Sequence, residues 1–181
     1  NGVLLALAAY LSFSLGDAVI KSLGGKLGTF EIAFWLMAFA AAFLYFSRPD
    51  GERWRDFWRT RRPLAVHARG LSAILGSILG VYAFTSIPFA ETYALIFLAP
   101  LFVTILSMVL LKEQIGPWRW FAVIAGFVAV VLVVRPGFRA LEPGHFAALA
   151  VAFMGASTVI LLRSLTQTEK RTTLLGYLLL Y

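Results

Sequence analysis

The sequence predicts an all-α membrane protein, a bundle of transmembrane helices joined by mostly short loops. Composition and segment length support this fold class. Sixty per cent of the 181 residues are hydrophobic and only 14% are charged, whereas soluble domains carry roughly 25% charged residues. The apolar residues form runs of about 17–22 residues, the length needed to cross ~30 Å of hydrocarbon at 1.5 Å per residue.

Six complete spans and the start of a seventh are expected along the chain. The six spans are 3–20, 29–46, 68–87, 91–111, 118–134 and 144–162. The final apolar run, 172–181, is too short to span a membrane, so we expect the chain to stop inside a helix, after about six and a half helices. In the Arg-rich segment 47–67, the spacing of Trp54, Phe57 and Trp58 predicts a short amphipathic helix on the membrane surface.

The basic residues predict the orientation of the spans. Alternate gaps contain 12 and 4 of the 16 Lys and Arg residues, and cytoplasmic loops carry the excess. We therefore expect a multi-pass protein of the bacterial inner (plasma) membrane with a cytoplasmic N-terminus. The same distribution argues against a nucleic-acid partner despite the net charge of +7, because the charge flanks the spans instead of covering one folded face.

A weak internal repeat relates the first and sixth spans. Residues 2–23 align without gaps on residues 144–165, with six identities in 22 positions and Lys21 opposite Arg163. Five spans separate the two starts, so the second copy should cross the membrane in the opposite direction. Inverted repeats of this kind are common in secondary transporters.

The stretch Ser86–Arg135 resembles the EamA-type drug/metabolite transporters. The similar features are the Pro88 and Glu91 start of the fourth span, Pro100 within it, the Lys112–Glu113 pair at its end, and Trp118 before a glycine-containing fifth span. The opening FSLGDAVIKSL and the Arg69–Gly70–Leu71 segment are also similar to this family, so the resemblance covers essentially the whole chain.

The resemblance implies a ten-helix fold of two inverted five-helix halves, a 5+5 arrangement. Residues 1–136 would be the first repeat, 137–143 a short external linker and 144–181 the start of the second repeat. It also implies a secondary transporter that moves a small metabolite or drug-like solute by alternating access, with no cofactor. Two alternatives stay open: a small-multidrug-type efflux subunit that works as a homodimer, and a non-transporting membrane scaffold.

Asp17 is the main candidate for substrate contact in the first span. A carboxylate inside a membrane helix is costly and usually faces a cavity or a partner. Helical spacing places it on one face with Tyr10 and Phe13, which suits a cationic or amphipathic substrate. The alternative is an i,i+4 ion pair with Lys21 at the membrane interface.

The third and fourth spans supply the other cavity candidates. Pro100 should kink the fourth span because it lacks the backbone N–H that the Ile96 carbonyl needs. Tyr93, Phe97 and Pro100 follow an i, i+4, i+7 spacing and are expected to line a cavity, with packing as the alternative for the two aromatic rings. The remaining candidates are Ser77 and Tyr82.

Three glutamates lie at ends of spans and are candidates for gating or for helix ends. Glu31 and Glu91 begin the second and fourth spans, where the helix dipole favours acidic side chains. The functional alternative for Glu91 is an outer gate or a proton-coupled site. Glu113 is expected to brace cytoplasmic helix ends.

No pattern of catalytic residues is present, so we expect neither an enzyme nor a metal centre. The chain has no cysteine, and His67 and His145 lack companions at metal-ligand spacing. The sequence contains no P-loop and no G-x-S-x-G motif. Small residues recur every four positions in the third and sixth spans and predict close helix packing; they are Ser72, Gly76, Gly80, Ala148, Ala152 and Ala156.

Overall fold

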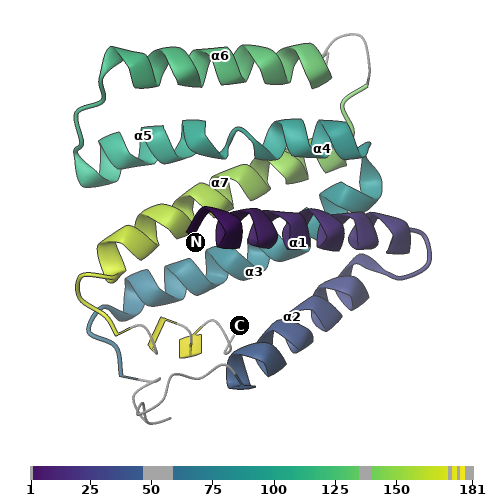
Figure 1. Ribbon diagram of the computed structural model, residues 1–181, viewed down its shortest axis with the longest axis horizontal. Helices are drawn as coiled ribbons and strands as arrows, with labels where there is room; N and C mark the ends of the chain where they lie inside the picture. Colours follow the sequence, from purple (N-terminus) through teal and green to yellow (C-terminus); the bar gives the residue numbers. More distant parts are fainter. Residues whose placement is uncertain (1, 47–58, 135–139, 171–172, 175, 178–181) are drawn as a thin grey trace.

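A computed structural model describes residues 2–46, 59–134, 140–170, 173–174 and 176–177. The regular elements within them are all helical (Figure 1). They are α1 (Gly2–Leu23), α2 (Thr29–Phe46), α3 (Pro63–Ser86), α4 (Phe89–Ile96), α5 (Ala99–Leu111), α6 (Pro117–Val134) and α7 (Pro143–Leu165). Because α4 and α5 are consecutive halves of one broken span, these helices form six apolar segments.

The apolar segments confirm a polytopic helical bundle. Within the described residues, four are long and apolar enough to cross a membrane, namely α1, α3, the combined segment Phe89–Leu111, and α7. α2 and α6 are apolar and slightly shorter over their described parts. The third span begins at Pro63, five residues before the expected start, because proline fits the first helical turn. The expected surface helix at Trp54, Phe57 and Trp58 lies outside the described residues.

Successive segments alternate in direction, so the turns gather at two ends of the bundle (Figure 1). One end carries the turns 24–28 and 87–88 and the start of α7. The other carries the turn 112–116, the start of α3 and the end of α7. α1 and α7 run in opposite directions, which is the geometry that an inverted repeat requires.

The centre of the bundle is the pairing of α3 with α7, which also contacts α4 and α5. The glycines of α3 lie close to side chains of α7: a Cβ added at Gly76 would lie 3.3 Å from the Met154 Cβ, and one added at Gly80 would lie 3.9 Å from the Val151 Cγ2. Ala148, Ala152 and Ala156 are at most 1% exposed. Small side chains let two backbones approach closely, where dispersion contacts replace the missing hydrophobic drive in lipid.

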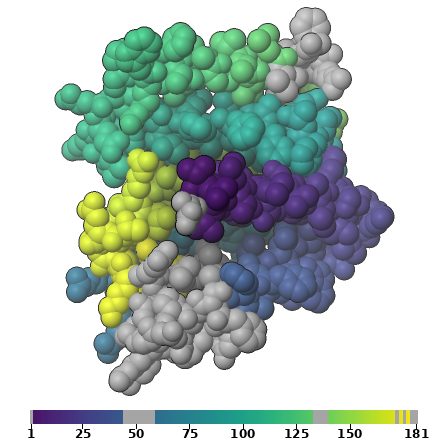
Figure 2. Space-filling model, viewed as in Figure 1, coloured from purple at the N-terminus to yellow at the C-terminus, as the bar shows by residue number. Residues whose placement is uncertain are grey.

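α1 lies across the front of the bundle (Figure 2), and most of its large apolar side chains are exposed. Its C-terminal end is held against α3. The Lys21 Nζ donates to the Ile87 carbonyl at 2.6 Å, and a Cβ at Gly24 would lie 2.9 Å from the Thr85 Cγ2. Gly25 turns the chain with a φ of 86°, a conformation that favours glycine.

The fourth span breaks immediately before Pro100, close to the expected kink. Phe97 and Leu98 form a turn between α4 and α5, and Pro100 occupies the first turn of α5. The break therefore lies in the turn that proline disrupts, since its ring and missing N–H act on the preceding residues.

Candidate functional site

Asp17 and Tyr93 join the first span to the fourth. The Tyr93 hydroxyl donates to the Asp17 Oδ2 at 2.6 Å, and Ser14 lies close to the same hydroxyl. Asp17 is half-buried. Among the described residues it makes no ion pair with Lys21, whose ammonium is directed at the Ile87 carbonyl. A carboxylate within a spanning helix is thus held by a phenol from another helix.

Aromatic rings surround Tyr93. Its ring centroid lies 4.8 Å from that of Phe89, 5.4 Å from that of Phe84 and 5.7 Å from that of Phe97. Edge-to-face and offset ring pairs contribute about 0.5–1.5 kcal/mol beyond burial. The cluster fixes the Tyr93 ring, and so the direction in which its hydroxyl presents to Asp17.

The other expected cavity residues differ in exposure. Tyr10 on α1 and Phe97 after α4 are 74% and 69% exposed, and Tyr82 on α3 is 37% exposed. Ser77 is partly buried on α3. The structure therefore brings Asp17, Tyr93 and Phe97 together and does not place Ser77 or Tyr82 in a hydrogen bond within the described residues.

Pro100 lies in a different place from Tyr93. It lines a cavity of about 450 Å³ between α5 and α7, whereas Tyr93 faces α1. The turn at Phe97 and Leu98 lies between the two residues. We call the space that Pro100 lines the α5–α7 cavity. Its lining residues are Ala99, Pro100, Val103, Thr104, Ser107, Arg119, Gly155, Ala156, Val159 and Arg163.

A buried carboxylate–imidazole contact links α4 to α7. Glu91 and His145 are 6% and 8% exposed, and the His145 Nε2 lies 2.8 Å from the Glu91 Oε2. The His145 Nδ1 accepts from the Glu142 backbone N–H at 3.0 Å. Glu91 stays in the first turn of α4, as expected for a helix-end acid, but it also contacts His145 of α7. The sequence does not reveal this partner, because 54 residues separate the pair. Both are third residues of helices that start at the same end of the bundle.

Glu31 and Glu113 occupy exposed helix ends. Glu31 lies in the first turn of α2. Glu113 follows Lys112, which ends α5 in a left-handed conformation with a φ of 54°. The Glu113 backbone N–H donates to the Ser107 carbonyl at 3.3 Å. Neither position brings its carboxylate near Asp17 or Glu91 in the described hydrogen bonds and ion pairs.

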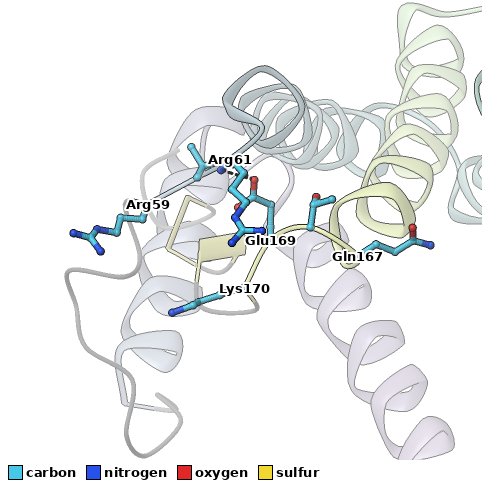
Figure 3. A pocket seen from close by; sticks show the side chains of 7 residues that line it. Arg59, Arg61, Gln167, Glu169 and Lys170 are labelled. Atoms are coloured by element: carbon cyan, nitrogen blue, oxygen red, sulfur yellow. Dashed lines mark hydrogen bonds between the residues drawn. The ribbon is translucent and has the colours of Figure 1, made fainter.

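A second polar connection lies at the opposite end of the bundle, beside a hollow of about 460 Å³ (Figure 3). Glu169, which sequence analysis did not single out, accepts hydrogen bonds from the backbone N–H groups of Arg61 and Arg62 at 2.7 and 2.6 Å. The Thr60 hydroxyl donates to the same oxygen at 3.0 Å. A carboxylate at a helix N-terminus is stabilised by unpaired N–H donors and the dipole, so Glu169 fastens the segment after α7 to the start of α3.

Metal chemistry finds no support in the described part of the chain. No group of three or more His, Asp or Glu side chains there is placed to hold a metal ion. The contacts of Asp17 with Tyr93 and of Glu91 with His145 instead connect helices.

Residues 1–135, most of the chain, match the EamA-like transporter family. The chain belongs to this family. The spanning segments, the broken fourth span and the alternation of helix directions suit this membership, and no solved structure matches the chain.

Curated relatives carry transporter names. The chain is 26% identical over 182 residues to the S-adenosylmethionine uptake transporter of Rickettsia prowazekii, covering 98% of this chain and 60% of the relative. It is 33% identical over 186 residues to the riboflavin transporter of Rhizobium johnstonii, covering 98% and 59%. It is 24% identical over 185 residues to human solute carrier family 35 member G1, covering 91% and 48%. The chain thus spans about three fifths of the length of the two bacterial relatives.

Proposed function

We propose that the protein containing this chain is a secondary transporter that moves a small metabolite across a bacterial inner membrane by alternating access. Family membership and the names of the relatives support transport of small solutes. The proposal places the N-terminus in the cytoplasm, on the strength of the 12 to 4 division of basic residues. Residues 1–136 form the first repeat, 137–143 the external linker and 144–181 the start of the second repeat.

The observation that carries the proposal is the hydrogen bond between Asp17 and Tyr93. A carboxylate in a spanning helix persists only where function or a partner compensates its cost. Here the partner is a neutral phenol, so the negative charge stays available to a solute that carries a cation or a hydrogen-bond donor. The exposed rings of Tyr10 and Phe97 offer flat apolar surface for the body of such a solute.

The test is solute accumulation in everted membrane vesicles carrying the full-length protein. The panel contains S-adenosylmethionine, riboflavin and cationic dyes, with and without an uncoupler. We expect Asp17→Asn to lower accumulation of one compound class about 10–100-fold, because a charged hydrogen bond contributes roughly 1.5–3 kcal/mol. Tyr93→Phe should lower it less.

The control is Ser12→Ala, since in the described part of the chain the Ser12 hydroxyl bonds the Ala8 carbonyl of its own helix and no other group. Accumulation that survives Asp17→Asn unchanged would remove Asp17 from the transport path. Accumulation of no compound by the unaltered protein would favour the scaffold alternative.

The homodimer remains an alternative arrangement, and the small-residue stripe does not support it. Gly76 and Gly80 lie against Met154 and Val151 of the same chain. Crosslinking between copies would therefore have to use another face.

A further inference from the structure

The electrostatics of the α5–α7 cavity are set by two arginines. Arg119 and Arg163 line it, and no acidic residue does. Thr104 and Ser107 on its wall are nearly buried, but their hydroxyl hydrogens serve the carbonyls of Pro100 and Thr104 within α5. Across the described part of the chain, neither guanidinium has a hydrogen-bond or ion-pair partner. The cavity therefore presents two positive charges without a counter-charge.

The position of Arg119 strengthens this positive field. It occupies the first turn of α6, which begins at Pro117. The N-terminal end of a helix carries a partial positive charge, so it disfavours a cation and favours an anion. An anion in the cavity would therefore be stabilised by both the guanidinium and the helix dipole.

The repeat shows that this cavity corresponds to the Asp17 face. Residues Gly155, Ala156, Val159 and Arg163 line the cavity. In the alignment of residues 2–23 with 144–165 they stand opposite Phe13, Ser14, Asp17 and Lys21. Equivalent faces of the two helices therefore have different neighbours. The face of α1 that carries Asp17 contacts α4, and the matching face of α7 lines a cavity with α5. On α7 the phenylalanine is glycine and the acid is valine, which opens space and removes the negative charge.

We propose that the α5–α7 cavity binds the anionic group, a carboxylate or phosphate, of an amphipathic solute. Arg119 and Arg163 hold the anion, and the walls of Pro100, Val103 and Val159 hold the apolar part. The volume of about 450 Å³ lies within the range of small-molecule sites. The identity of this solute as the transported one rests on the proposed function; the anion selectivity of the cavity does not.

Cysteine chemistry tests the selectivity without requiring transport, because the chain has no cysteine. Val159→Cys is introduced into the full-length protein, with any other cysteine replaced, in phosphatidylcholine vesicles. The rates of modification by anionic sulfonatoethyl and cationic trimethylammonioethyl methanethiosulfonate are compared. We expect the anionic reagent to modify the thiol faster than the cationic one. The ratio of the anionic rate to the cationic rate should fall about tenfold in Arg119→Gln/Arg163→Gln. Arg61→Gln is the matched control, because Arg61 lines the separate hollow beside Glu169.

Three results would overturn the proposal. The first is an equal ratio of the two modification rates with and without the two arginines. The arginines would then serve only to set the orientation of the spans at the membrane interface. The second is a ratio that falls as much in Arg61→Gln, which would indicate a general surface potential. The third is protection of the thiol by added phosphatidylglycerol and not by an anionic solute, which would assign the cavity to a lipid headgroup.

A second arm links the cavity to transport. Riboflavin 5′-phosphate and riboflavin differ only in the phosphate, and the phosphate form should protect Val159→Cys more strongly. Equal protection by both compounds, or by neither, contradicts an anion site for an amphipathic solute. A protein that transports nothing but keeps the reagent selectivity refutes the proposed function and leaves the cavity's anion preference intact.

Discussion

Asp17 and Glu91 illustrate two uses of a carboxylate in a membrane helix. Glu91 is almost fully buried and is matched by an imidazole, so its cost is offset inside the fold. Asp17 is half-buried and accepts from a phenol, which leaves its charge uncompensated by a cation within the described residues. Both arrangements connect helices, and we propose that the second exchanges its partner for a solute.

We predict that His145→Leu destabilises the protein by about 1–3 kcal/mol, because it withdraws a hydrogen-bond partner from the buried Glu91 carboxylate. The apparent melting temperature of the purified full-length protein in detergent measures this. Glu91→Gln/His145→Gln should recover part of the loss, since two amides can bond each other. Glu31→Gln, an exposed acid in the equivalent turn of α2, should change stability by less than about 0.5 kcal/mol. If Glu31→Gln lowered stability as much as His145→Leu does, loss of the Glu91–His145 contact would not be the cause.

At the level of elements, close approach of α3 and α7 organises the bundle. Small side chains on both helices allow it, and the start of α7 is the tightest point. A Cβ at Gly144 would lie 2.7 Å from the Ile87 Cγ2 and 3.0 Å from the Ser86 Cβ. Ile87 is itself 1% exposed and its carbonyl binds Lys21, so a shift there would spread to α1.

Gly144→Ala should therefore lower the free energy of unfolding by about 1–3 kcal/mol through overpacking. Gly155→Ala on the same helix is the matched variant, because a Cβ there meets no atom within 4 Å. It should be neutral or stabilising by up to about 1 kcal/mol, since alanine favours the helix. Chemical unfolding monitored by far-UV circular dichroism compares the two, and equal losses would show that helix propensity and not packing controls α7.

For the whole molecule, the two ends of the bundle carry different connections. The end with Lys21, Glu91 and His145 links α1, α3, α4 and α7, while the end with Glu169 links the segment after α7 to α3. Both ends contain a contact between residues before 135 and residues after 140, and the alternating access that we propose would require such connections to break at one end at a time. Orientation in the membrane decides which end is external.

The charge distribution predicts that the turn 24–28 is external and the turn 112–116 cytoplasmic. A cysteine at Lys26 should react with an impermeant maleimide in intact spheroplasts. A cysteine at Gln114 should react only after the membrane is permeabilised. The reverse pattern would show that the protein is inserted in the opposite orientation.

The spans and their approximate ends could be predicted from the sequence, because lipid leaves no alternative for an apolar run. Every backbone N–H and C=O must be satisfied within the segment, so length and hydropathy decide the helix locally. The break near Pro100 is equally local, since a single residue lacks the N–H. Asp17 could be singled out for the same reason: its cost depends only on being charged within an apolar helix.

The partners of these residues depended on the tertiary structure. Tyr93 bonds Asp17 across 76 residues, and Glu169 bonds Arg62 across 107; no local pattern specifies which helix faces which. Hydropathy therefore determined that this chain crosses a membrane repeatedly. Packing decided that Tyr93 bonds the acid on α1 while Pro100, seven residues later, lines the α5–α7 cavity with Arg119 and Arg163, because these neighbours come from distant parts of the sequence and depend on how the helices pack.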